Sequence, residues 1–284
     1  MTATLRHRTF VTTPIPLPGR GSLPDCSPRM WSPITSTLIS GDRDALLVDP
    51  PLTNGQAAEV GDWILAADRR LRGIYVTHGH GDHWFGAIPL LQRFPDAVVY
   101  ATAGTSRHMA AQNAPDFRNG FWDAIFPGEL PTGHVDVSVV DETGFELEGQ
   151  RLLPVEVGHT DTDATTLLHV PAIDLLVAGD VVYNGVHLYL TESGGSAGLD
   201  QWLAALDTAE RLHPATVVAG HKNPDAADDP AQIAATRRYL TDARRLLQSS
   251  TRATDFYQGM LALHPDRINP GALWGAALTL FPQA

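Results

Sequence analysis

The chain has 284 residues, of which 43% are hydrophobic, and it carries 32 acidic against 20 basic residues. This composition is typical of a globular protein with a substantial core, and the formal charge of −12 opposes binding to phosphate backbones. No apolar run reaches transmembrane length and residues 1–10 lack the apolar stretch of a secretory signal, so we expect a cytoplasmic protein with neither nucleic-acid nor membrane partners.

The predicted elements begin with a proline- and glycine-rich segment, residues 12–33, which indicates an ordered arm. The turn sequence GDRD separates residues 36–40 from residues 45–50 and predicts a hairpin. Further strands are predicted at residues 73–78, 97–102, 135–140, 151–159, 164–171, 173–180 and 215–221. Helices are predicted at residues 55–71, 87–94, 199–213 and 229–248, the last with Asp229 as its N-cap.

This order of elements predicts an α/β protein in which helices cover the outer faces of two mixed sheets. We expect one domain over residues 1–284, with residues 1–33 as an N-terminal arm and residues 229–284 as a helical segment packed on it. The apolar residues 271–281 are expected to pack on the body or on a partner chain, and the second arrangement would produce a homodimer.

Several predicted strands end at a residue that binds metal ions in other proteins, and the sequence HGHGDH follows one of them directly. The resulting candidate ligands are His78, His80, Asp82, His83, His159, Asp180 and His221. Five histidines and two carboxylates exceed the needs of one tetrahedral ion and suit two ions that share a carboxylate. In a locally extended turn His78 and His80 point the same way, so Asp82 and His83 would face a second ion. The single cysteine, Cys26, excludes a thiolate-rich zinc site.

The sequence HGHGDH resembles the HxHxDH signature of the metallo-β-lactamase superfamily. His159 in GHTDTD, Asp180 in AGD and His221 in AGH match the later motifs of that family in order. Asp49 in LLVDP matches an aspartate that precedes the signature. The resemblance covers roughly residues 35–225 and implies a four-layer αββα sandwich with its metal ions at one edge.

The resemblance also implies a role for each candidate ligand. The first ion would be held by His78, His80 and His159, and the second by Asp82, His83 and His221. Asp180 would bridge the two ions, and Asp49 would hold the ligand loop by hydrogen bonds. Two divalent ions are therefore expected, with zinc first and with manganese, iron, cobalt or nickel also suited to such nitrogen and oxygen ligands.

Two neighbouring ions that share a bridging carboxylate favour hydrolysis of an ester, lactone, amide or thioester in a small-molecule substrate. Asp82 is the expected catalytic carboxylate, which orients the nucleophile or transfers its proton. Tyr183 stands three residues after Asp180, as does a tyrosine of the family's acyl-homoserine lactonases that contacts the substrate carbonyl or leaving oxygen. On this ground we favour a lactone or ester, although Tyr183 packed beneath the metals is an equal alternative.

Other activities stay open within the same family. A β-lactamase-like amidase is one, and a glyoxalase-II-like thioesterase is another, although Gly79 stands where its motif has a further histidine. An iron-dependent sulfur dioxygenase is a third alternative. The acidic charge disfavours the superfamily's nucleases, and the complete ligand set disfavours a protein that only binds metal.

Several residues close to the candidate ligands in the sequence are expected to have structural roles. Asn184 and His187 follow Tyr183 and could line the pocket, but a structural role is favoured for both. Lys222 is expected to be solvated, and Trp84 is expected to belong to the core or to the pocket wall. Asp161 and Asp163 are expected to be turn residues. The remaining histidines have no ligand spacing and are expected at the surface or in the core; these are His7, His108, His134, His169, His213 and His264.

Overall fold

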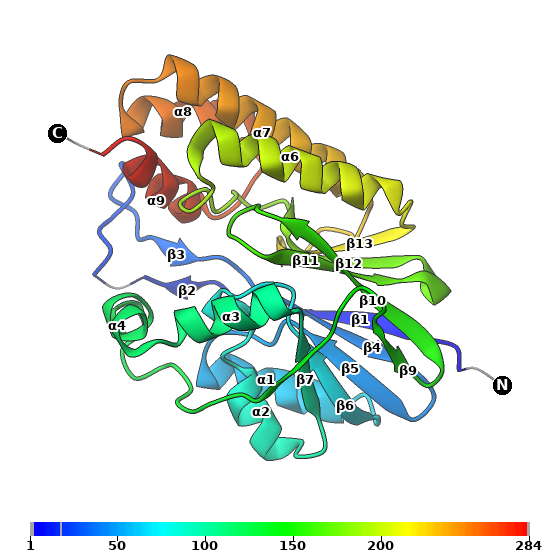
Figure 1. Ribbon diagram of the computed structural model, residues 1–284. Coiled ribbons are helices and arrows are strands. Elements are labelled where there is room, and N and C mark those ends of the chain that lie inside the picture. Colours follow the sequence, from blue (N-terminus) through cyan, green and yellow to red (C-terminus); the bar gives the residue numbers. More distant parts are fainter. Residues whose placement is uncertain (1–2, 18, 283–284) are drawn as a thin grey trace.

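The computed structural model describes residues 3–17 and 19–282, and two β-sheets lie face to face at its centre (Figure 1). The first sheet has the order β1-β4-β5-β6-β7-β8. Its strands are β1 (Arg6–Val11), β4 (Thr35–Ser40), β5 (Asp44–Val48), β6 (Arg70–Tyr75), β7 (Val98–Ala101) and β8 (Val137–Val139). The antiparallel pairing of β4 with β5 confirms the predicted hairpin, and the strands from β5 to β8 run parallel.

The second sheet has the order β13-β12-β11-β10-β9. Its strands are β9 (Phe145–Leu147), β10 (Gln150–Gly158), β11 (Thr165–Val170), β12 (Leu175–Asn184) and β13 (Thr216–Lys222). Only β12 and β13 pair in parallel. Between the sheets, buried side chains from the first sheet, such as Tyr75, pack against buried side chains from the second, such as Val177.

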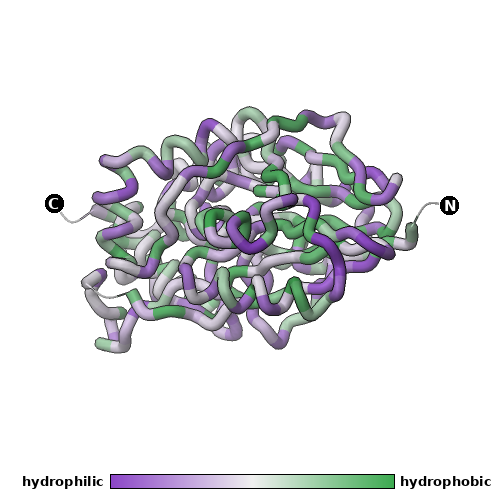
Figure 2. The backbone as a smooth tube through the Cα atoms, turned by 90° about the horizontal axis from the view of Figure 1, so that it is seen from below, coloured by the Kyte–Doolittle hydropathy of each residue, from purple (hydrophilic) through white to green (hydrophobic). Residues whose placement is uncertain are grey.

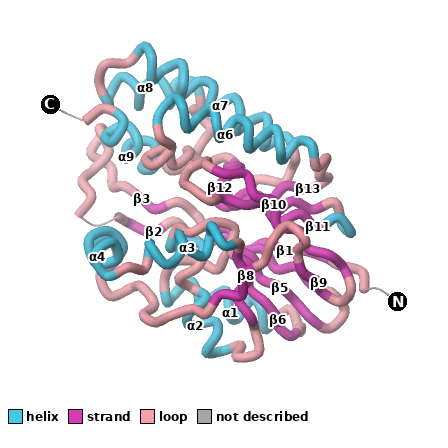
Figure 3. Tube along the Cα trace, in the orientation of Figure 1, coloured by secondary structure: helices cyan, strands magenta, loops and turns pink. Residues whose placement is uncertain are grey.

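Helices cover the outer face of each sheet, which confirms the αββα architecture (Figure 3). On one side lie α1 (Asn54–Leu65) and α2 (Ala87–Arg93), and on the other lie α6 (Gly195–Arg211), α7 (Ala231–Ser249) and α8 (Ala253–Leu263). The remaining helical segments are η1 (Gly81–His83), α3 (Ala103–Gln112), α4 (Pro115–Phe117), η2 (Arg118–Trp122), α5 (Asp123–Ile125), η3 (Pro171–Ile173) and α9 (Pro270–Leu280). Buried hydrophobic side chains form clusters between the sheets and beneath the helices on each side, and hydrophobic stretches alternate with hydrophilic ones along the chain (Figure 2).

Several element boundaries differ from those predicted. The first helix ends at Leu65, well before residue 71, because Arg70 already pairs with Asp44 in the sheet. Helix α7 begins at Ala231, and its N-cap is Pro230, although the Asp229 carboxylate still accepts a hydrogen bond from the Ala231 N–H at 2.7 Å. β1 and α3 were not predicted, whereas α8 (Ala253–Leu263) lies in the segment that was predicted to be helical.

The proline-rich arm and the C-terminal helix meet beside the ends of the strands. Within the arm, β2 (Ile15–Pro16) pairs with β3 (Met30–Trp31). Helix α9 packs against α8 and β3, so the apolar end of the chain packs on the body, which was one of the two expected arrangements. Among the described residues, no helix combines the length and apolar character needed to span a bilayer.

Candidate metal centre

The HGHGDH sequence forms a buried loop that leads from β6 into η1. His78, His80, Asp82 and His83 are all at most 6% exposed. The two glycines allow this crowding, because a Cβ at position 79 would lie 2.5 Å from the His108 side chain and one at position 81 would lie 2.6 Å from Phe85. The glycines therefore let neighbouring side chains close around the four polar residues.

Strands β12 and β13 bring Asp180 and His221 to the same place. Both strands continue past the predicted ends, to Asn184 and Lys222, so neither residue ends its strand. A Cβ at Gly220 would lie only 2.1 Å from Asp180 Oδ1. Gly179 has a positive φ of 49°, and a Cβ there would meet Thr77 Oγ1 at 2.4 Å. Glycine before each of these two residues thus permits close approach.

Asp82, His83 and His221 form a group whose ligand atoms lie within 4.8 Å of one another, and we call it the second ligand group. The Nε2 atoms of His83 and His221 are 3.4 Å apart. Each of these nitrogens lies 3.3 Å from one oxygen of Asp180. Asp180 therefore adjoins the second ligand group with both carboxylate oxygens.

His78, His80 and Asp161 form a similar group, which we call the first ligand group. Asp161 Oδ2 lies 3.1 Å from His80 Nδ1 and 3.8 Å from His78 Nε2. Asp161 lies in the bend between β10 and β11, as expected, but it is completely buried and faces the two histidines. Asp163, by contrast, is exposed.

The structure does not place His159 in either ligand group. Its Nδ1 lies 2.6 Å from Asp163 Oδ1. Its Nε2 faces the start of α6, where a Cβ at Gly198 would lie 2.9 Å from it. Of the seven candidate ligands, five lie in the two groups and Asp180 adjoins the second, whereas His159 lies outside both and Asp161 lies in the first.

Each imidazole in the two groups is held through the nitrogen that faces away from the cluster. The Nδ1 atoms of His78, His83 and His221 lie beside Thr77 Oγ1, Asp49 Oδ2 and the Pro33 carbonyl oxygen, at 3.0, 3.2 and 2.7 Å. The Nε2 atom of His80 lies 3.3 Å from Glu192 Oε2. A proton on these outer nitrogens leaves a lone pair on each inner nitrogen, which is the arrangement that metal-binding histidines require.

Asp49 fixes the loop from behind. Its carboxylate accepts hydrogen bonds from the Thr77 N–H at 2.9 Å and the Thr77 hydroxyl at 2.7 Å, as well as contacting His83. His78 Nε2, Asp161 Oδ2 and Asp180 Oδ1 are buried without a hydrogen-bond partner. Buried polar atoms without partners are costly, and cations placed among these atoms would satisfy them, so the residues present fit two divalent ions.

The charges in the cluster shift its protonation strongly. Burial lowers the pKa of His83, but Asp180, Asp82 and Asp49 outweigh this effect and raise it to about 10. Burial also favours the neutral form of Asp180, yet the neighbouring His221 and His83 hold its pKa well below the usual range. Burial and the Asp180 carboxylate raise the pKa of Tyr183 well above the usual range, so its hydroxyl keeps its proton.

A pocket borders the cluster, and Asp82, Asp180, His80 and His221 are among the residues that line it. Apolar and aromatic side chains line much of the rest; these include Leu17, Met30, Trp31, Phe121, Trp122 and Ala272. Polar side chains, Glu192 and Asn269 among them, complete the lining. The Trp31 indole N–H donates to Asp82 Oδ2 at 2.9 Å, so the arm contacts the candidate catalytic carboxylate directly.

Tyr183 borders this pocket but is completely buried, and its hydroxyl donates to Asp180 Oδ2 at 2.5 Å. Asn184 and His187 do not border it. The Asn184 amide donates to the Ala227 carbonyl oxygen, and His187 Nδ1 lies 3.0 Å from the Tyr239 hydroxyl. Both residues therefore have the structural roles that were expected.

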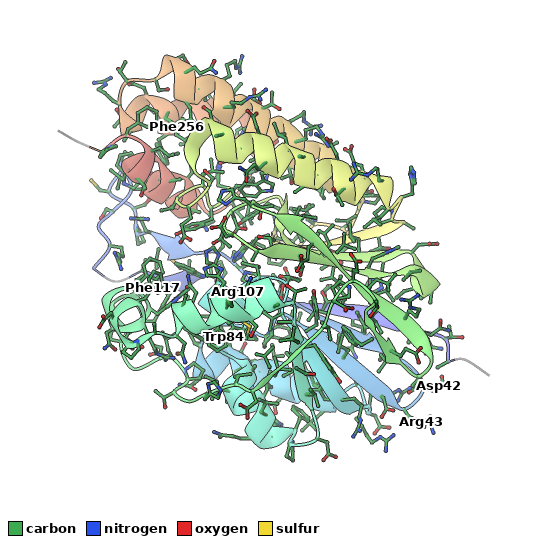
Figure 4. All side chains as sticks on the ribbon, in the orientation of Figure 1. Asp42, Arg43, Trp84, Arg107, Phe117 and Phe256 are labelled. Carbon is green, nitrogen blue, oxygen red and sulfur yellow. The ribbon has the colours of Figure 1, made fainter. Side chains whose placement is uncertain are left out.

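Lys222, Trp84 and His108 also had positions predicted from the sequence. Lys222 is buried and its ammonium group pairs with Asp228, so the prediction of a solvated lysine is wrong. Trp84 is part of the core beneath α3, and its indole N–H donates to the Gly79 carbonyl oxygen (Figure 4). His108, expected to be unrelated to the site, lies beside His80 and Glu192.

Sequence reasoning missed Asp161, Glu192 and the hydrogen bond from Trp31 to Asp82. The alternation in HTDTD carried a signal for Asp161, because residues two apart in an extended segment project to the same side and either His159 or Asp161 could then face the ions. The contacts of Glu192 with His80 and of Trp31 with Asp82 gave no such signal, since each joins separate parts of the chain.

The comparisons with known proteins agree with this geometry. The family model described as "Metallo-beta-lactamase superfamily" matches residues 29–221. A hydroxyacylglutathione hydrolase from Blochmanniella pennsylvanica is 32% identical over 114 residues, which are 36% of this chain and 43% of that protein. The chain thus spans less than half the length of this relative.

Solved structures show the same fold at low sequence identity. A metallo-beta-lactamase family protein from Thermus thermophilus has a TM-score of 0.63 and 19% identity, with 96% of this chain and 91% of that one covered. A metallo-beta-lactamase from Pontibacter korlensis has a TM-score of 0.58 and 20% identity, with 85% and 97% covered. These likenesses concern the fold alone.

Proposed function

Because the chain belongs to the metallo-β-lactamase superfamily, we propose that it is a metal-dependent hydrolase of a small acyl compound, with a lactone or ester as the favoured substrate. The observation that carries the proposal is the pair of ligand groups at the end of an apolar pocket. Two divalent ions there, zinc being our first choice, would lower the pKa of water and polarise a carbonyl group.

The chain's own residues would orient the reaction. Asp82 is fixed at the end of the pocket by the Trp31 indole, so its carboxylate is placed to accept a proton and return it to the leaving group. The Tyr183 hydroxyl is committed to Asp180 in this structure. We therefore assign Tyr183 first to positioning Asp180, and contact with the substrate would require that hydrogen bond to break.

The pocket walls favour an uncharged, apolar substrate. Aromatic side chains of Trp31, Phe121 and Trp122 would bury the acyl chain and exclude water from it. Glu192 adds a negative charge to the pocket. Burial raises the pKa of this carboxyl group, but the contacts with His80 and Tyr189 outweigh burial and lower the pKa to about 2. Arg29 also borders the pocket, but its guanidinium group donates to the carbonyl oxygens of Arg20 and Gly271.

A thioesterase is the second candidate, because relatives named hydroxyacylglutathione hydrolase share 32–41% identity over their matched segments. Two features favour the lactone or ester instead. A carboxylate-rich thioester would meet Glu192 in the pocket and a chain of net charge −12. In addition, the glyoxalase-II-like motif has a histidine at the position of Gly79. The His108 side chain fills the space beside Gly79, so a histidine does not fit there.

Proton release from a panel of γ-lactones, homoserine lactones and aryl esters tests the proposal on zinc- and manganese-loaded protein. Asp180→Asn serves as the inactive control, and Asp96→Asn, at an exposed position, controls for a change of charge. We expect turnover that requires metal and that Asp180→Asn abolishes. No turnover of lactones or esters by fully loaded protein would reject this substrate class, and thioesters, β-lactams and oxygen uptake would be assayed next.

A further inference from the structure

We propose that Asp161, in place of His159, completes the first ligand group, so that two imidazoles and one carboxylate bind the first ion. The inference deepens the proposed function, since it assumes that the site holds metal. It concerns the ligand set alone and is tested by metal binding without any substrate.

The position of the Asp161 carboxylate is the first argument. Oδ2 faces His80 Nδ1 at 3.1 Å and His78 Nε2 at 3.8 Å, and these are the two nitrogens left free for a ligand. Both His78 Nε2 and Asp161 Oδ2 are buried without a hydrogen-bond partner. An ion between the three atoms would satisfy all of them at once, whereas an ion pair with His80 alone would leave His78 Nε2 unpaired.

The other carboxylate oxygen is anchored. The Thr160 hydroxyl donates to Asp161 Oδ1 at 2.8 Å and is itself close to Thr165 at the start of β11. This contact turns Oδ2 toward the histidines. Metal-binding carboxylates are commonly held in this way, by a hydrogen bond to the oxygen that does not bind the ion.

His80 is oriented for the same geometry. Its outer nitrogen, Nε2, lies beside Glu192, and the Thr162 hydroxyl donates to the same Glu192 oxygen at 3.3 Å. Glu192 therefore joins the loop that carries Asp161 to the ring that Asp161 faces. The imidazole lies between two carboxylates, with its Nδ1 directed at Asp161.

His159 lies outside the group, and its Nδ1 contacts Asp163 at 2.6 Å. Its Nε2 is also buried without a hydrogen-bond partner, but it faces Gly198 at the start of α6, where a Cβ would lie 2.9 Å from it. The strand before it bends, because the pairing of β10 with β11 shifts register between Glu156 and Gly158 and Gly158 has a φ of 81°. Two residues beyond His159, Asp161 is the residue of this loop that lies with His78 and His80.

Replacing an imidazole by a carboxylate changes the chemistry of the site. It adds a negative charge and a harder oxygen donor to the first ligand group. Carboxylate oxygens suit manganese and other hard divalent ions better than imidazole does. We therefore expect the first ion to be exchanged for manganese more readily than the ion at the second ligand group.

Metal content measures the inference directly. Metal-free protein is dialysed against zinc, and separately against manganese, and bound metal per chain is determined by inductively coupled plasma mass spectrometry. The variants are Asp161→Asn, Asp161→Glu and His159→Ala, with Asp163→Asn as a matched control at an exposed aspartate of the same loop. Circular dichroism confirms that each variant is folded.

We expect two ions per chain in the native protein, in His159→Ala and in Asp163→Asn, and one in Asp161→Asn. Asp161→Glu, which keeps the carboxylate, should bind two ions and should bind the second at least tenfold more strongly than a folded Asp161→Asn variant. If the asparagine variant unfolds, the metal content of Asp161→Glu and of His159→Ala decides the question, and loss of an ion by Asp161→Glu would count against the inference. Loss of an ion by His159→Ala, or two ions retained by Asp161→Asn, would overturn the inference. A native protein that binds two ions but hydrolyses no acyl substrate would reject only the proposed function.

Discussion

The hydrogen bond from Trp31 to Asp82 provides a quantitative test of how the arm supports the metal centre. Trp31→Phe removes the indole N–H and keeps an aromatic ring against Trp122 and Phe126. The bond is 2.9 Å long and its acceptor is 3% exposed, so it belongs to the charge-assisted bonds of buried groups. Such bonds contribute about 1.5–3 kcal/mol, and we take the lower value because water from the pocket can replace the donor.

A loss of about 1.5 kcal/mol corresponds to a roughly tenfold change in an equilibrium constant. Without the indole N–H, the Asp82 carboxylate is held less strongly in the orientation in which it would bind metal. We therefore expect Trp31→Phe to weaken binding of one zinc ion about tenfold, measured by competition with a chromophoric chelator. Trp63→Phe is the matched control, because Trp63 packs on Phe10 instead of the ligand groups. Equal zinc affinities for Trp31→Phe and the native protein would refute the role of the indole N–H.

The remaining predictions concern the support of the ligands and their protons. Asp49→Ala leaves the Thr77 N–H and His83 Nδ1 without their acceptor and should lower the free energy of unfolding by about 2–4 kcal/mol, measured by urea denaturation of metal-free protein; a change below about 0.5 kcal/mol would contradict this. Tyr183→Phe should lower kcat roughly 10- to 100-fold with two ions still bound, and unchanged kinetics would remove Tyr183 from the mechanism. The raised pKa of His83, about 10, means that the folded metal-free protein keeps a proton that the unfolded chain loses near pH 6.5. This proton stabilises the metal-free protein fully below about pH 6.5, and the contribution is lost as the pH rises through 10. Zinc binding at pH 8 should consequently release protons, seen as a binding enthalpy that depends on the ionisation enthalpy of the buffer; identical enthalpies in phosphate and Tris would contradict it.

The sequence predicted the layers of the fold because most strands and helices carry their own periodic or terminal signals. The apolar runs at β5, β12 and β13 and the amphipathic pattern of α6 are examples. β1 was missed because its pairing with β4 depends on a partner about 30 residues away, and its own residues, RHRTFV, are half polar. The helix α3 was missed because its ten residues have no clear apolar face.

The candidate site was predictable where ligands follow strands or lie within HGHGDH, since local spacing then fixes their relative positions. The position of Asp161 was not predictable, because local alternation allows either His159 or Asp161 to face the histidines, and the loop follows a register shift in β10 and a left-handed Gly158 that the sequence does not reveal. The hydrogen bond from Trp31 to Asp82 was also not predictable, because the two residues meet only after the arm folds against α9.

Anomalous diffraction from crystals of zinc-loaded protein tests the central claim most directly. We predict two zinc peaks, one bound by His78 Nε2, His80 Nδ1 and Asp161 and the other by Asp82, His83 and His221, with Asp180 between them and ligand distances of about 2.0–2.2 Å. A single peak, or two peaks bound by residues other than these two groups, would contradict a two-metal centre in this protein.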